Sequence, residues 1–228
     1  MIRAIQGVLL HADWAEAYGV TGPLPRHTLS VAERLDDIAQ RKAAPLDYQR
    51  LPEQRSTGSC RDFALLLTAA LRAKSIPARI RCGFAAYFQP HWEDHWVCQY
   101  WDAASGTWRL ADAQIDAMLA TRLAIAFDPA DIPRAQFRTA GEAWLDCRKN
   151  GEDVGRFGHG AVTGQWFTAI NVVRDHLALN GFVTSDWDRW REAADAVRRV
   201  DQDHLAWLDD LAGSPERAPT KRQPDWLA

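Results

Sequence analysis

The segment from Gly58 to Asp116 constrains the fold of this chain more than any other part. From Arg61 to Lys74, apolar residues recur at helical spacing, which predicts a central helix with one buried face. Ile76-Pro77 ends that helix. Three strands are then predicted, at 78–88, 95–101 and 107–112, and Ala104 to Gly106 has the composition of a hairpin turn between the last two.

Three residues of this segment are candidates for a nucleophilic triad: Cys60, His95 and Asp112. Cys60 stands where the predicted helix begins, and the positive end of the helix dipole there favours the thiolate form. An imidazole in reach holds the thiol proton, and a carboxylate orients the imidazole. Strand alternation and the turn place His95 near the level of Asp112 or slightly beyond it, so the two side chains are able to meet. Asp112 is preferred to Asp116 because it directly follows the apolar strand.

The same segment resembles the transglutaminase-like superfamily of papain-fold thiol enzymes. The motifs that carry the resemblance are, in order, Gly58-Ser59-Cys60-Arg61-Asp62-Phe63-Ala64, Leu71-Arg72-Ala73, Ile76-Pro77-Ala78-Arg79, Gly83-Phe84, His95-Trp96 and Trp108 to Asp112. The resemblance implies an α+β, papain-like core in which the cysteine helix packs on an antiparallel sheet. It also implies that Cys60, His95 and Asp112 form a catalytic triad.

Two positions depart from the family pattern. Trp96 follows His95 directly where the family often has an intervening alanine, and Asp112-Ala113-Gln114 stands for the family's Asp-Pro-Thr. Neither departure removes a catalytic atom. The chain also shows no calcium-loop pattern of the kind expected for the larger cross-linking enzymes.

An oxyanion hole for this chemistry needs the backbone N–H of Cys60 and a second donor. Gln54, six residues upstream, has the spacing of the papain-type oxyanion glutamine and is our candidate. The alternative is that Gln54 is simply a polar residue in the polar loop predicted from Tyr48 to Thr57.

The other cysteines and histidines have less specific settings. Cys82 and Cys98 are predicted to pack as small apolar residues inside strands, and Cys147 is interpreted in the same way. The two histidines of the segment from His91 to His95 suggest a metal site, but the segment lacks the HExxH pattern, so neither a metal nor another cofactor is expected. His159 is either a second functional imidazole or, as the sequence favours, a solvated loop residue.

Further elements are predicted on both sides of this segment. Ser30 and Glu33 form a capping box for a helix that continues towards Pro45. Helices are also predicted at about 117–126, 137–148, 165–179 and 185–211, while Gly151 to Gly164, with five glycines, is predicted to be a loop and a candidate lid. We therefore expect a core at 1–116, a helical extension of the same domain at 117–213, and a mobile tail at 214–228.

Composition narrows the setting and the partners. The chain has 228 residues and a formal net charge of −3, which points to neither nucleic acid nor an anionic membrane as a partner. No apolar run approaches the roughly 20 residues that span a bilayer. Four scattered cysteines favour a reduced, cytoplasmic setting.

The predicted activity is thiol-dependent acyl transfer, or amide or ester hydrolysis, through an acyl-enzyme on Cys60. The expected substrate is a small-molecule, peptide or carrier-bound acyl compound, and the acceptor is an amine or water. Two alternatives stay open: a peptidase or amidase, and a non-catalytic member that uses the fold to bind peptides.

Overall fold

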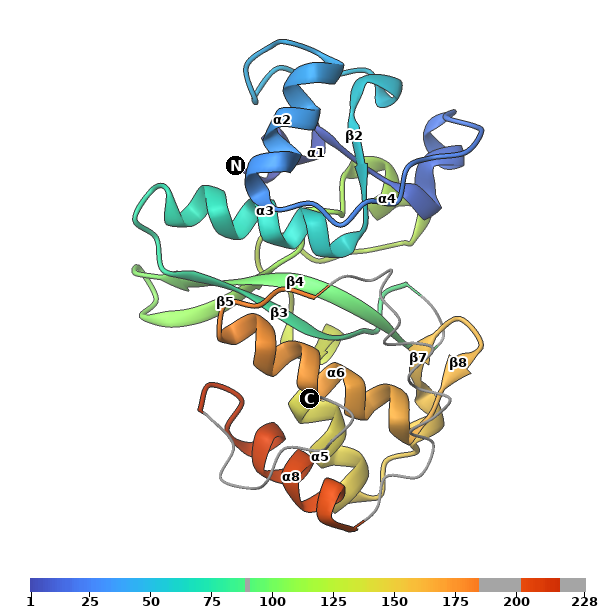
Figure 1. Cartoon of the computed structure of the whole chain (residues 1–228), viewed down its shortest axis with the longest axis vertical. Coiled ribbons are helices and arrows are strands. Elements are labelled where there is room, and N and C mark those ends of the chain that lie inside the picture. The colour runs from blue at the N-terminus through green and yellow to red at the C-terminus, as the bar shows by residue number, and fades with distance from the viewer. Residues whose placement is uncertain (89–90, 185–201, 218–228) are drawn as a thin grey trace. The chain divides into compact units, whose positions relative to one another are not determined.

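A computed structural model describes residues 1–88, 91–184 and 202–217 of the chain (Figure 1). The described residues fall into two compact units. Unit 1 comprises Met1–Ile80 and Trp96–Ile132, and unit 2 comprises the described parts of Arg81–His95, Pro133–Thr184 and 202–217. Each unit combines segments that are separate in the chain, so the units do not test the division that we predicted at residue 116. That division stays a prediction.

Unit 1 contains the cysteine helix α3 (Cys60–Arg72), further short elements, and strands of the main sheet. The further elements are α1 (Ile2–Gln6), β1 (Leu9–His11), the 3₁₀ helix η1 (Ala12–Tyr18), α2 (Val31–Arg41), the 3₁₀ helix η2 (Pro52–Gln54), β2 (Ser56–Gly58) and α4 (Ala117–Arg122). The predicted capping box is confirmed: the Ser30 N–H donates to Glu33 Oε2 at 2.8 Å, and the Glu33 N–H donates to Ser30 Oγ at 3.3 Å.

The prediction of a loop from Tyr48 to Thr57 was wrong at its end. Ser56–Gly58 form β2, which pairs in parallel with β1 and aligns Ser56 with Leu9 and Gly58 with His11. Three residues are too few to show strand periodicity in the sequence. The pairing matters because β2 leads directly into α3.

The main sheet is mixed. Its strands are β3 (Ala78–Ala85), β4 (Trp92–Asp102), β5 (Thr107–Ala111), β6 (Phe137–Thr139), β7 (Phe157–His159) and β8 (Val162–Thr163). The order is β6-β3-β4-β7-β8, and β5 pairs with β4. The expectation of an antiparallel sheet is corrected here, because β7 runs parallel to β4, with Trp92 opposite Phe157.

Two strand predictions also needed revision. β4 begins at Trp92, three residues before the start of the strand that we predicted at 95–101. The glycine-rich segment 151–164 contains β7 and β8 as an antiparallel pair and is therefore not a loop throughout. The close pairing of β7 and β8 requires a glycine at position 158, since a Cβ atom there would lie 2.2 Å from the Val162 carbonyl oxygen.

The core of unit 1 confirms that α3 is central. Phe63, Leu66, Leu67 and Leu71 of α3 pack with Ala78 of β3, Cys98 of β4 and Ala111 of β5. Thr68 adds a polar contact to the same face, donating its hydroxyl to Cys98 Sγ at 3.2 Å. The apolar stripe seen in the sequence is thus the face that α3 buries against the strands.

Unit 2 is built on the helices α5 (Ala140–Asn150), α6 (Gln165–Leu179) and α8 (Gln202–Gly213) (Figure 1). The three helices share an apolar core. The bounds predicted for the helix at 165–179 are confirmed. Of the helix predicted at 185–211, the part from Gln202 is helical. Residues 185–201 of that helix, and residues 218–228 of the predicted tail, lie outside the described residues. Among the described residues, none of the helices is long and apolar enough to cross a membrane.

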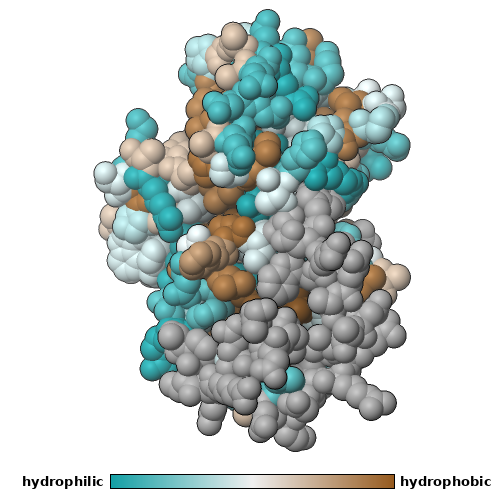
Figure 2. Space-filling model, viewed as in Figure 1, coloured by the Kyte–Doolittle hydropathy of each residue, from teal (hydrophilic) through white to brown (hydrophobic). Residues whose placement is uncertain are grey.

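One loop of unit 1 is organised around a buried arginine. Arg50 is only 2% exposed, and its guanidinium donates to four backbone carbonyl oxygens at 2.8 to 3.2 Å, those of Lys42, Ala44, Pro45 and Tyr48. The loop leaves Leu46, Tyr48 and Leu51 about half exposed. The neighbouring surface over α2 is mostly hydrophilic on the face drawn in Figure 2.

Candidate active site

Cys60 is the first residue of α3, a helix of 13 residues. Ser59 precedes it in an extended conformation as the N-cap residue, and β2 ends at Gly58. Cys60 is partly exposed, whereas the residues on both sides of it are buried. The structure therefore places this thiol at a helix N-terminus, as the sequence predicted.

Asp62 holds the start of this helix. Its Oδ2 atom accepts a hydrogen bond from the Ser59 N–H at 2.9 Å. Gly58 makes room for that carboxylate, because a Cβ atom at this position would lie 2.6 Å from Asp62 Oδ2. The spacing of glycine, cysteine and aspartate in this motif thus has a steric origin: the glycine admits the side chain that caps the helix.

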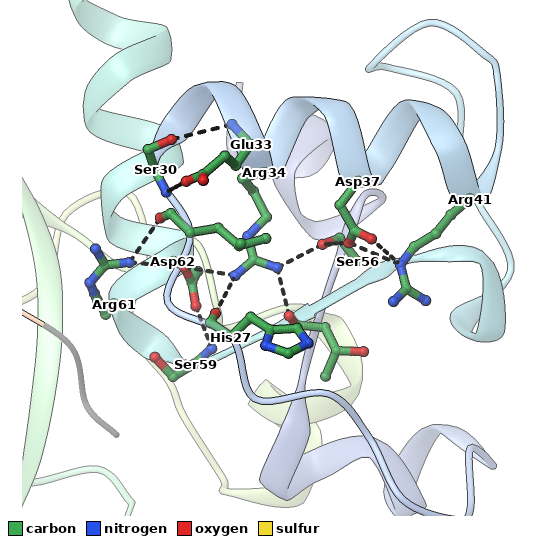
Figure 3. Close-up of polar contacts among 12 residues, drawn as sticks. His27, Ser30, Glu33, Arg34, Asp37, Arg41, Ser56, Ser59, Arg61 and Asp62 are labelled. Carbon is green, nitrogen blue, oxygen red and sulfur yellow. Dashed lines mark hydrogen bonds and ion pairs between the residues drawn. The ribbon is translucent and has the colours of Figure 1, made fainter. Parts of the chain in front are cut away.

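Two arginines bind the same carboxylate (Figure 3). Arg34 Nη2 lies 3.0 Å and Arg61 Nη1 lies 3.1 Å from Asp62 Oδ1, and none of the three side chains is more than 6% exposed. Arg34 also donates to Ser56 Oγ at 2.7 Å and to the Thr57 carbonyl oxygen at 2.6 Å. One side chain of α2 therefore connects to β2 and to the first turn of α3.

Asp112 follows β5 directly and is 2% exposed. Its Oδ1 atom accepts a hydrogen bond from the Gln114 N–H at 2.8 Å, and its own N–H donates to the Pro129 carbonyl oxygen at 2.8 Å. Both the backbone and the side chain of Asp112 are therefore held in place.

Asp116 has a structural role instead. It caps α4 by accepting the Leu119 N–H at 3.0 Å, and it accepts the Tyr18 hydroxyl at 2.9 Å. Burial, together with the Asp116 charge, raises the pKa of Tyr18 well above its usual value, so the hydroxyl remains a donor. These contacts favour Asp112 over Asp116 as the candidate catalytic carboxylate.

His95 lies within β4 and is 2% exposed. Two aromatic rings contact its imidazole: the Phe88 centroid at 4.7 Å and the Tyr87 centroid at 5.8 Å. The preceding residue, Asp94, points to the other face of the strand, where it accepts hydrogen bonds from Asn171 at 3.0 Å and Arg174 at 3.1 Å. The backbone at His95 is thus held by its neighbour while the aromatic rings pack on the imidazole.

The strand register bears on how His95 and Asp112 are disposed. Cys98 pairs with Ala111 and Gln99 with Leu110. Continued by one residue, this register brings Asp112 to the level of Val97, and alternation gives Val97 and His95 the same face of β4. Cys60 and Asp112 belong to unit 1, and His95 is the last residue of its unit 2 segment.

Gln54, the candidate oxyanion donor, ends η2 in unit 1. Its Oε1 atom accepts a hydrogen bond from the Leu51 N–H at 3.3 Å, so the side chain also closes its own turn. A role for Gln54 in an oxyanion hole stays a prediction.

The remaining cysteines differ from Cys60 in their surroundings. Cys82 and Cys98 are fully buried, which confirms that they pack as small apolar residues. Burial raises the pKa of Cys98 to about 12. Burial and then the nearby Glu152 and Asp146 raise the pKa of Cys147 to about 11. At neutral pH the thiolate is therefore scarce at Cys98 and Cys147.

His159 pairs with a carboxylate. Its Nδ1 atom lies 2.6 Å from Glu93 Oε1, while His91 Nε2 lies 3.0 Å from Glu93 Oε2. Burial raises the pKa of Glu93, but hydrogen bonds from His159, the Gly160 N–H and His91 outweigh burial and leave it below its usual value. The sequence showed the two histidines but not this pairing, because β7 brings His159 beside β4 from more than 60 positions along the chain.

Comparison with protein-family models matches residues 35–113 to the transglutaminase-like superfamily. Residues 35–113 are the part of the chain that is similar to this superfamily. The matched range includes Cys60, His95 and Asp112, and it confirms the resemblance inferred from the motifs. No curated protein and no solved structure matches the chain. The mixed sheet with its helices agrees with a papain-type core of this superfamily.

Proposed function

We propose that this protein is a thiol enzyme that transfers or hydrolyses acyl groups through an acyl-enzyme on Cys60. The observation that carries the proposal is the position of Cys60. It is the first residue of α3, inside the segment of superfamily similarity that also contains His95 and Asp112. Superfamily membership supports cysteine-based catalysis, and the helix N-terminus supplies a physical reason for a reactive thiol.

In the proposed first half-reaction, the Cys60 thiolate attacks the carbonyl carbon of an amide, ester or thioester. A carbon–sulfur bond forms, and the carbonyl electrons move to oxygen. When the carbonyl re-forms, the bond to the leaving group breaks and the His95 imidazolium gives that group its proton. Asp112 orients His95, and the Cys60 N–H with Gln54 stabilises the oxyanion.

In the second half-reaction, an amine or water attacks the thioester. His95 takes the proton from the attacking nucleophile, and the sulfur leaves as thiolate. The two acceptors require the same three residues, so the triad does not distinguish transferase from hydrolase. The proposed substrates are small-molecule, peptide or carrier-bound acyl compounds.

The decisive test is to trap the acyl-enzyme. The protein would be incubated with a panel of amides, aryl esters and thioesters, quenched with acid, and mapped by peptide mass spectrometry. We expect an acyl adduct on Cys60 that disappears in Cys60→Ala and persists in Cys98→Ala and Cys147→Ala. A parallel incubation with a primary amine present before the quench distinguishes acyl transfer from hydrolysis by the product that is released.

Alkylation by iodoacetamide is the second test. At pH 7 we expect Cys60 to react faster than a free cysteine peptide, and Cys98 and Cys147 to react far more slowly because their thiol pKa values are raised to about 12 and about 11. If Cys60 is no faster than the peptide and Cys60→Ala behaves as the parent throughout, the protein is a non-catalytic member of the superfamily. Cleavage of unstructured peptides without amine incorporation would identify a peptidase.

A further inference from the structure

Arg34 is a charged residue on the buried side of a helix. α2 is a strongly polar helix whose sequence is VAERLDDIAQR, and its buried residues are Arg34 and Ile38. The Arg34 side chain is only 4% exposed. Burying a guanidinium is costly unless its donors are paired, so the contacts that pair it indicate what this residue is for.

Three of those contacts are with residues close to Cys60 in the chain: Ser56, Thr57 and Asp62. Arg34 donates to Ser56 Oγ and the Thr57 carbonyl oxygen on β2, and it lies 3.0 Å from Asp62 on α3 (Figure 3). A further donor reaches the His27 carbonyl oxygen at 3.3 Å. Arg34 therefore contacts the chain on both sides of the segment Gly58–Cys60: at Ser56 and Thr57 before it, and at Asp62 after it.

Charged side chains gather around this turn. Arg34 and Arg61 both lie within ion-pair distance of the Asp62 carboxylate, in a buried setting. Other charged or titratable residues near this turn include His27, whose carbonyl oxygen accepts from Arg34, and His11, which β1 aligns with Gly58. Asp37 accepts the Ser56 hydroxyl and binds Arg41. Burial raises the pKa of Asp37, but these hydrogen bonds and the charges of Arg41 and Arg34 leave it below its usual value.

We infer that Arg34 is a positioning residue for Cys60. It fixes the Asp62 carboxylate that caps α3, it holds β2 at the entry to the helix, and it contributes positive charge that favours the thiolate. The inference rests on the proposed function, because positioning has a measurable consequence only if Cys60 is a reactive thiol. It also assigns a role to a residue outside the motifs around Cys60, His95 and Asp112.

The experiment compares Arg34→Met, Arg34→Gln and Arg34→Lys with the parent. Arg41→Met is the matched control, since Arg41 lies on the same helix with its side chain 28% exposed. The readout is the pH profile of Cys60 alkylation, together with the thermal midpoint of each variant. We expect Arg34→Met to move the midpoint of the profile up by about one pH unit and to slow alkylation at pH 7 by about tenfold.

The other variants separate charge from packing. Arg34→Gln should behave like Arg34→Met, Arg34→Lys should recover part of the parent rate, and Arg41→Met should match the parent. If Arg34→Met does not fold, Arg34→Gln gives the same readout. A folded neutral variant with the parent profile overturns the inference and leaves the proposed function intact, whereas a slow parent thiol overturns the proposed function itself.

Discussion

At the scale of single residues, the start of α3 depends on the steric fit between Gly58 and Asp62. The glycine has no side chain, and the aspartate occupies the room that a side chain would fill. The aspartate in turn satisfies the Ser59 N–H, one of the donors that a helix leaves unpaired at its start. Cys60, the proposed nucleophile, therefore lies between two residues whose roles are steric and electrostatic.

The substitution Gly58→Ala tests this steric fit. The added methyl group would lie 2.6 Å from Asp62 Oδ2 and 2.9 Å from its Cβ atom, so the carboxylate must move. We expect a loss of about 1 to 3 kcal/mol in the free energy of unfolding, measured by urea denaturation, together with slower Cys60 alkylation. Gly213→Ala is the control and should be neutral, because nothing lies within 4 Å of the added atom. A Gly58→Ala variant with the parent's stability and reactivity would show that the motif glycine has another purpose.

At the scale of elements, α6 carries a buried polar network as well as its apolar stripe. Asp175 pairs with Arg81 of β3 at 2.7 Å, and Arg174 pairs with Asp94 of β4 at 3.1 Å. Asn171 connects to the second pair by donating to Asp94 and accepting from Arg174. The helix thus fixes the strand segments that precede His95 through paired charges.

Asp175→Asn should therefore be strongly destabilising. Arg81 would keep a buried guanidinium without its counter-charge, and we expect a loss of about 3 kcal/mol or more in the free energy of unfolding. Asp146→Asn on α5 is the matched control: its partner Arg138 lies 3.2 Å away, and both side chains are about one-third exposed. That change should cost less than about 1 kcal/mol. Equal losses in the two variants would mean that the Arg81–Asp175 pair has no special role.

The elements also show what the sequence was able to predict. Long periodic segments and local signals were sufficient for α2, α3 and α6, and the motif residues led to the superfamily match. The strands β2, β7 and β8 were missed because two or three residues carry no periodicity, and their pairing partners are distant in the chain. The burial of Arg34 was missed for the same reason. Its partners come from β2 and α3, and no local sequence pattern predicts a buried arginine.

At the scale of the whole molecule, the chain passes repeatedly from one compact unit to the other. β3 begins in unit 1 and continues into unit 2, and β4 runs from unit 2 into unit 1. A strand that is continuous through both units couples them, because its unpairing in one unit exposes backbone groups up to the boundary with the other. We therefore expect the two units to unfold together.

Thiol labelling under denaturant tests that expectation. Cys82 lies in unit 2 and Cys98 in unit 1, and each is fully buried. Pulsed alkylation across a urea gradient, read by peptide mass, should give coincident midpoints for these two residues. Separate midpoints would show that the units are independent folding units despite their shared strands.

The loop closed by Arg50 has a consequence for proteases. Trypsin needs the basic side chain in its specificity pocket and an extended backbone on either side of the cleaved bond. In this loop the Arg50 guanidinium is committed to four carbonyl oxygens of Lys42, Ala44, Pro45 and Tyr48. The bond after Arg50 is thereby withheld from cleavage in the native protein, although the flanking Leu51 side chain faces solvent. The Arg50–Leu51 bond therefore lies in a surface segment between α2 and β2 and is still protected from cleavage.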